Sequence, residues 1–145
     1  MTPIFTHHLV VRFRDCDALG HVNNAVYLTY LEESRFAFWR ASGLGRQAPD
    51  PAPADGDPSA AALGVIVARV EIDYRRPAKH GDKLRIHIGV AAIGRTSFTC
   101  EYEIVDAAET LIANARTVIV RYDYAAGRPV LLDEGIRLAL TRELR

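Results

Sequence analysis

A change in hydrophobic period constrains the fold of this chain more than any other feature of its sequence. From Asn24 to about Ser42 there is no Gly or Pro, and apolar residues recur at helical spacing, which predicts one long helix ended by Gly43. From residue 66 to about residue 124 the period is two, which predicts four strands. A further strand is expected at 8–14, before the helix.

This order of elements predicts an α+β domain in which a five-stranded antiparallel sheet wraps around one long central helix. Asp133 is expected to cap a short C-terminal helix. The four later strands are expected to pair as consecutive hairpins, with a tight turn at Gly94 and Arg95. In the first of them the alternation places five residues on the buried face: Ile66, Ala68, Val70, Ile72 and Tyr74.

An open sheet of this kind leaves its edge strands exposed. Pairing two such sheets edge to edge would cover the edges, so we expect a homodimer or a dimer-of-dimers tetramer. The length of 145 residues suits a single domain spanning 1–145. Within it, residues 45–62 are rich in Ala, Pro and Asp and predict a long loop, which either shapes a substrate entrance or is a surface insertion.

Composition and missing motifs exclude several classes of protein. Lys plus Arg and Asp plus Glu are balanced at 18 each, which disfavours a nucleic-acid partner. No apolar run is long enough for membrane insertion and no signal peptide is recognisable, so a cytoplasmic location is expected. Motifs of serine hydrolases, nucleotide-binding loops and metal sites are absent, and Cys16 and Cys100 are expected to be free thiols.

The segment from Asp15 to Asn24 carries the candidate chemistry. Asp15 and Asp17 lie just before the predicted helix, where the backbone N–H of Asn24 is placed to hydrogen-bond an oxygen that gains negative charge. A nearby carboxylate could attack a thioester carbonyl or activate water. The alternative is that these Asp and Asn residues only cap the helix and the turn, and spacing alone favours that alternative. His21 either orients a carboxylate, contacts the substrate or is a surface residue, and Cys16 is expected to be structural.

Candidate substrate contacts lie on either side of this segment. Tyr27 is expected in the core, at an edge that can also line an acyl tunnel, and Asn23 is grouped with it as a candidate substrate-binding residue. If two turns approach each other across a dimer, their donors would suit the phosphates of coenzyme A: Arg76 on one turn, and Arg95, Thr96 and Ser97 on the other. The alternative is ordinary turn chemistry.

The run from Arg14 to Leu28 resembles the D-x-D-x-x-G-H-V-N-N-x-x-Y-L signature of the hotdog-fold 4-hydroxybenzoyl-CoA thioesterase-like family. The run 72–82 is similar to the second signature of that family. The resemblance implies a hotdog fold, active sites between subunits, Asp17 as general base or nucleophile and the amide of Asn24 as the group that polarises the thioester. It implies no cofactor, since coenzyme A is part of the substrate. The His-Val-Asn-Asn form departs from the aryl-specific branch, which makes fatty or other short acyl groups plausible.

The expected function is therefore hydrolysis of an acyl-CoA thioester. Two alternatives remain at this stage: a non-catalytic module that binds acyl-CoA or acyl-carrier protein, and a hotdog hydratase or dehydratase. The sequence does not define the acyl chain or the carrier.

Overall fold

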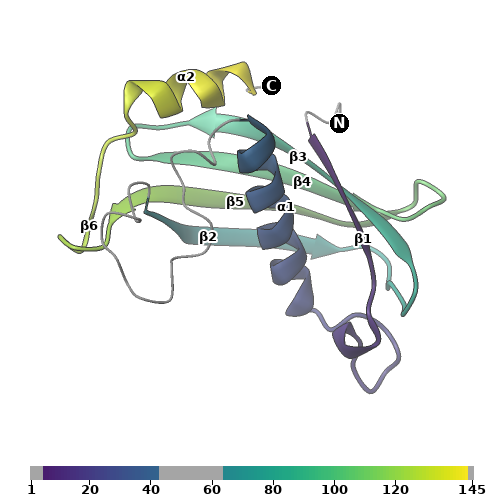
Figure 1. The fold of residues 1–145 in the computed structure, drawn as a ribbon. Helices are drawn as coiled ribbons and strands as arrows, with labels where there is room; N and C mark the ends of the chain where they lie inside the picture. The colour runs from purple at the N-terminus through teal and green to yellow at the C-terminus, as the bar shows by residue number, and fades with distance from the viewer. Residues whose placement is uncertain (1–4, 43–63, 144–145) are drawn as a thin grey trace.

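The computed structural model describes residues 5–42 and 64–143 of the chain. Within them, a twisted antiparallel sheet carries one long helix across its inner face and a shorter helix at one end (Figure 1). In chain order the elements are β1 (Phe5–Val10), the 3-10 turn η1 (Phe13–Asp15), α1 (Val26–Ser42), β2 (Val65–Tyr74), β3 (Lys83–Ile93), β4 (Ser97–Val105), β5 (Leu111–Asp123), β6 (Arg128–Pro129) and α2 (Glu134–Arg142). The expected α+β architecture is confirmed.

The strand order corrects two details of the expected sheet. The sheet has six strands rather than five, because the two-residue β6 pairs with the end of β5. The order β1-β3-β4-β5-β2 confirms consecutive hairpins for β3, β4 and β5, but the expected hairpin between β2 and β3 is wrong. The segment 75–82 instead crosses the end of the sheet, where the Val22 N–H donates to the carbonyl of the fully buried Ala78 (2.8 Å). This segment is too long for a tight turn and contains Pro77, which has no N–H to donate.

The first strand and the first helix differ from their expected bounds for local reasons. β1 ends at Val10, because the chain then enters η1, where the Asp15 carboxylate accepts a hydrogen bond from the Arg12 backbone N–H (3.0 Å). The helix begins at Val26 rather than at Asn24, because Asn23 forms a turn ahead of it: Asn23 Oδ1 accepts from the Ala25 N–H (2.9 Å) and Asn23 O accepts from the Val26 N–H (2.9 Å).

The expected alternation along β2 is correct in one half of the strand. Val70, Ile72 and Tyr74 lie opposite inward-facing residues of β5, as expected. A bulge between Val67 and Arg69 resets the alternation, so Val67 rather than Ile66 pairs with the buried Ile119. Ile66 therefore belongs to the outer face.

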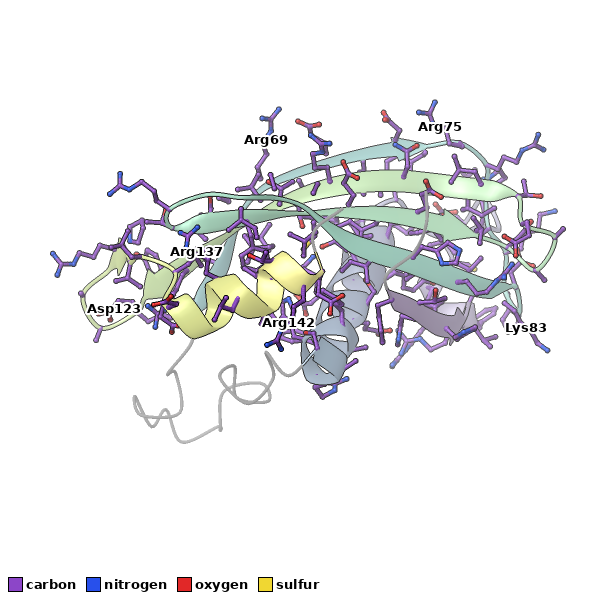
Figure 2. All side chains as sticks on the ribbon, turned by 90° about the horizontal axis from the view of Figure 1, so that it is seen from above. Arg69, Arg75, Lys83, Asp123, Arg137 and Arg142 are labelled. Atoms are coloured by element: carbon purple, nitrogen blue, oxygen red, sulfur yellow. The ribbon has the colours of Figure 1, made fainter. Side chains whose placement is uncertain are left out.

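The core lies between α1 and the inner face of the sheet, with α1 packed chiefly against β1 and β3. Inward-facing side chains alternate along the central strands and are almost fully buried: Leu84, Ile86, Ile88 and Val90 on β3, Phe98, Cys100, Tyr102 and Ile104 on β4, and Ala113, Thr117 and Ile119 on β5. Charged side chains such as Arg69 of β2 and Arg75, just after β2, project from the opposite face, away from α1 (Figure 2). The helix therefore covers one face and leaves the other polar.

The cap of α2 and the state of the two cysteines agree with the sequence. Asp133 caps α2, with its Oδ1 accepting from the Ile136 N–H (2.9 Å), as expected. Cys16 and Cys100 are both free, and burial raises the pKa of the Cys100 thiol to about 12.

The loop at 45–62 and the helix end at Gly43 lie outside the described residues. Among the described helices none is long and apolar enough to cross a membrane.

Candidate active site

The loop between η1 and α1 is anchored by Asp15. The residue is 2% exposed, and its carboxylate accepts hydrogen bonds from the Arg12 backbone (3.0 Å), the Arg12 guanidinium (3.0 Å from Nη2) and the Tyr30 hydroxyl of α1 (2.7 Å). Burial by itself would raise the pKa of Asp15, but the hydrogen bonds from Arg12 and Tyr30 outweigh burial and hold its pKa below the ordinary value. Both oxygens of this carboxylate are occupied, so Asp15 connects the loop to the helix.

Asp17 stands on a tight turn and keeps one oxygen free. The Asp17 N–H donates to the His21 carbonyl (3.0 Å) and the Gly20 N–H donates to the Asp17 carbonyl (3.0 Å), with Gly20 at φ 87°, where a side chain would be strained. Asp17 Oδ1 accepts from the Leu19 N–H (2.9 Å), which orients the carboxylate. Its Oδ2 has no hydrogen-bond donor among residues 5–42 and 64–143, so it is available for chemistry.

The backbone at Asn24 is held from both sides. In the peptide that follows it, the Ala25 N–H donates to Asn23 Oδ1 (2.9 Å) and the Asn24 carbonyl accepts from the Tyr74 hydroxyl (2.9 Å). The Asn24 N–H has no acceptor in the described part of the chain. It therefore remains an available donor at the start of α1, where the helix dipole adds partial positive charge.

Asp17 and Asn24 line the same pocket, of about 430 Å³, which we call the Asp17 pocket. That volume is in the range of small-molecule sites. Its walls come from the loop, the first turn of α1 and the segment after β2, and are formed by Asp17, His21, Val22, Asn24, Tyr27, Tyr74, Arg75, Arg76 and Pro77. The structure thus brings together four of the predicted site residues around Asp17: His21, Asn24, Tyr27 and Arg76.

Two tyrosines form the inner wall of the Asp17 pocket. Tyr27 is 3% exposed, and its ring packs edge to face against Tyr30 (5.8 Å between centroids) and Tyr74 (5.3 Å). Burial raises the pKa of Tyr27, which keeps its hydroxyl neutral. Tyr74 was not among the predicted site residues. It belongs to the second signature, but the alternation along its strand indicates only the face on which it lies.

The other predicted residues stand apart from the pocket. Asn23 uses its side chain in the turn before α1, where Oδ1 accepts from the Ala25 N–H, and its role in substrate binding stays a prediction. Arg95, Thr96 and Ser97 lie at the opposite end of the sheet. Ser97 pairs with Val120 of β5, whereas Tyr74 pairs with Ala113, and this seven-residue step is roughly 23 Å at about 3.3 Å per residue. Within one chain the two turns do not meet.

A larger hollow, of about 620 Å³, lies on the outer face of the sheet. Its charged side chains are satisfied across strands: Arg116 pairs with Glu101, and Arg75 Nε donates to Asn114 Oδ1 (2.9 Å). Figure 2 shows Arg75 projecting from this face. Because neither Asp17 nor Asn24 lines it, this hollow is a weaker candidate for the chemistry.

The sequence of residues 11–140 matches the thioesterase-like superfamily. The chain belongs to that superfamily. The match covers both the Asp17 pocket and the strands that frame it, so the resemblance noted in the sequence is confirmed. Membership makes the chain an enzyme of the thioester hydrolase class.

Individual members of the thioesterase-like superfamily resemble the chain over almost its whole length. The acyl-CoA thioester hydrolase YbgC of Escherichia coli O6:H1 is 27% identical over 135 residues, which cover 93% of this chain and 94% of that protein. A thioesterase from Thermus thermophilus, in complex with coenzyme A and zinc, is 32% identical with a TM-score of 0.74, covering 94% and 92% of the two chains. A predicted thioesterase from Bacillus stearothermophilus is 25% identical with a TM-score of 0.82, covering 97% and 96%.

Proposed function

We propose that the protein hydrolyses acyl-CoA thioesters to a free acid and coenzyme A, with Asp17 and the backbone amide of Asn24 as its catalytic groups. The observation that carries this proposal is their joint position: a carboxylate with one free oxygen and a backbone N–H without an acceptor among the described residues line one pocket. The hydrolases among the relatives support the same reaction. No cofactor is needed, because the reaction consumes only the thioester and water.

Two routes use the same groups. In the first, Asp17 takes a proton from water, the hydroxide attacks the thioester carbon, and the C–S bond breaks as the thiolate leaves and takes that proton. In the second, Asp17 attacks the carbonyl itself and coenzyme A leaves as thiolate. Water then hydrolyses the mixed anhydride, which restores the Asp17 carboxylate, releases the acid and returns a proton to the thiolate. In both, the Asn24 N–H stabilises the negative oxygen. His21 lines the pocket, and we propose that it contacts the substrate or the attacking water.

We further propose that two copies pair through β2 and that each complete site spans both. β2 is one of the two edge strands of the described sheet, and Ile66, Val67, Val70 and Tyr74 on it are 38–46% exposed. Antiparallel pairing of two β2 edges about a two-fold axis places the Val65 end of one strand opposite the Tyr74 end of the other. The turn with Arg95, Thr96 and Ser97 of the second copy would then reach the Asp17 pocket, where it and Arg76 would bind the coenzyme A phosphates.

The Asp17→Asn substitution tests the proposed chemistry. Asparagine keeps an oxygen to accept the Leu19 N–H, so the turn is retained while the base or nucleophile is lost. Turnover of acyl-CoA, followed as free thiol, should fall by about 10²–10⁴-fold with little change in thermal stability. Glu134→Gln, which changes an exposed carboxylate on α2, serves as the matched control and should retain activity. Full turnover by Asp17→Asn would rule out this assignment.

A screen across acyl length, with both aliphatic and aromatic acyl groups, distinguishes the alternatives. Tight binding of acyl-CoA without release of thiol would favour a non-catalytic binding module. Formation of an enoyl product in place of free coenzyme A would favour a hydratase or dehydratase. The same screen repeated with acyl-carrier protein identifies the carrier.

A further inference from the structure

We propose that Tyr74 is a positioning residue for the thioester-polarising donor: its hydroxyl, bound to the carbonyl of Asn24, holds the Asn24 N–H aimed at the thioester oxygen. The proposal rests on the proposed role of Asn24. This role of Tyr74 in the reaction is not indicated by its position at the end of β2 or by the alternation of side chains along that strand.

The geometry of one peptide group carries the inference. The Asn24–Ala25 peptide is fixed at its N–H by the side chain of Asn23 and at its carbonyl by the hydroxyl of Tyr74, each at 2.9 Å. These bonds lie on opposite sides of the peptide, so together they fix its plane. The N–H of Asn24 belongs to the preceding peptide, which is joined to this plane through the φ and ψ angles of Asn24, and it has no acceptor among the described residues. The orientation of that donor therefore depends on the two bonds to the neighbouring peptide.

The ring of Tyr74 is itself supported by the core. It packs edge to face on Tyr27 (5.3 Å), which packs on Tyr30 (5.8 Å), whose hydroxyl donates to Asp15 (2.7 Å). This row of aromatic rings connects the end of β2 to the anchored base of the Asp17 loop. The hydroxyl of Tyr74 therefore acts from a defined position, although 46% of the residue is exposed.

A positioning role predicts a specific kinetic signature. The Asn24 N–H contributes most when the carbonyl oxygen becomes negative, so disorder of this donor weakens the transition state more than the bound substrate. Partial burial raises the pKa of Tyr74, which keeps its hydroxyl a donor at alkaline pH. Loss of the hydroxyl should therefore lower kcat and leave KM nearly unchanged.

The first experiment compares Tyr74→Phe with wild type in the full-length protein. Phenylalanine keeps the ring against Tyr27 and removes only the hydroxyl, so kcat should fall about 10-fold while KM changes by less than about twofold. Thr6→Val is the matched control, because it also removes one hydroxyl hydrogen bond of 2.9 Å, to His87 on the outer face of the sheet. The control should leave kcat unchanged. Wild-type kcat in Tyr74→Phe, or an equal loss in Thr6→Val, would overturn the proposal.

The second experiment measures the hydrogen bond from the Asn24 N–H to the thioester carbonyl without turnover. An acyl-CoA with a ¹³C-labelled thioester carbonyl is bound to the Asp17→Asn protein, and its infrared stretching frequency is compared with that in water. Hydrogen bonding from Asn24 should lower the frequency, and adding Tyr74→Phe should remove about half or more of that shift. An identical shift with and without the Tyr74 hydroxyl would contradict the inference. If the wild-type protein released no free thiol from acyl-CoA while the shift in Asp17→Asn still depended on Tyr74, the proposed hydrolysis would be ruled out and the positioning role would stand.

Discussion

At the scale of single residues, the two aspartates of the loop have separate tasks. Asp15 is buried with both oxygens bonded to Arg12 and Tyr30, whereas Asp17 is half-buried with one oxygen free of donors from the described residues. Spacing alone could not distinguish them, because Arg12 and the side chain of Tyr30 meet Asp15 only in the folded chain. The resemblance selected Asp17, and the geometry supplies a physical reason for that choice.

This separation predicts the effect of Asp15→Asn on stability. The variant should lose about 2 kcal/mol of unfolding free energy at pH 7, because hydrogen bonds to a charged group are replaced by weaker ones. The folded-state pKa of Asp15 is lowered, so the stabilisation is present above the unfolded pKa of about 4 and is lost as pH falls below it. Urea unfolding at a series of pH values should show the two proteins converging in acid. A difference that stays constant through this range would contradict the prediction.

At the scale of elements, caps and turns were the features that sequence predicted best. The Asp133 cap, a turn after β3 and the alternation along β3, β4 and β5 each depend on neighbouring residues, and the structure has them. The place of β2 beside β5 and the bulge after Val67 depend on contacts between distant segments, and no local pattern reveals them. The same reason explains why Tyr74 was missed: its partner Asn24 lies fifty residues earlier in the chain.

The contribution of the α2 cap to stability can be measured by comparing two substitutions of Asp133. Asp133→Ala removes the oxygen that accepts the Ile136 N–H and should cost about 1 kcal/mol. Asp133→Asn keeps such an oxygen and should lose only a few tenths of a kcal/mol of unfolding free energy. It also weakens the ion pair with Arg121, whose Nη2 lies 3.7 Å from the carboxylate. Chemical denaturation of both variants measures the difference. Equal losses would show that the ion pair, rather than the cap, stabilises this end of the molecule.

At the scale of the whole molecule, the separation of Asp17 from Arg95 has a consequence for activity. If each site takes Asp17 from one copy and the 94–97 turn from the other, two inactive variants should restore each other when mixed. After subunit exchange of Asp17→Asn with Arg95→Glu, about a quarter of wild-type activity should return at low substrate concentration, because half of the randomly formed dimers are mixed and each has one intact site.

A second mixture provides the control for this restoration. Asp17→Asn combined with the double variant Asp17→Asn/Arg95→Glu contains no intact Asp17 and should remain inactive. Native mass spectrometry confirms that mixed dimers have formed. Mixed dimers of the first pair without activity would indicate that each site is built within a single chain.

The bulge in β2 also limits where residues can be inserted or deleted in this protein during evolution. An inserted or deleted residue elsewhere in this strand would turn Tyr74 to the outer face and away from Asn24. Ala68 lies between the two paired halves of the strand, which meet β5 at Val67 and Arg69, and its deletion would restore a regular ladder with Tyr74 still facing inward. We therefore expect length variation among relatives of this chain to concentrate in connecting segments, and a shortened β2 to have lost the residue at the bulge.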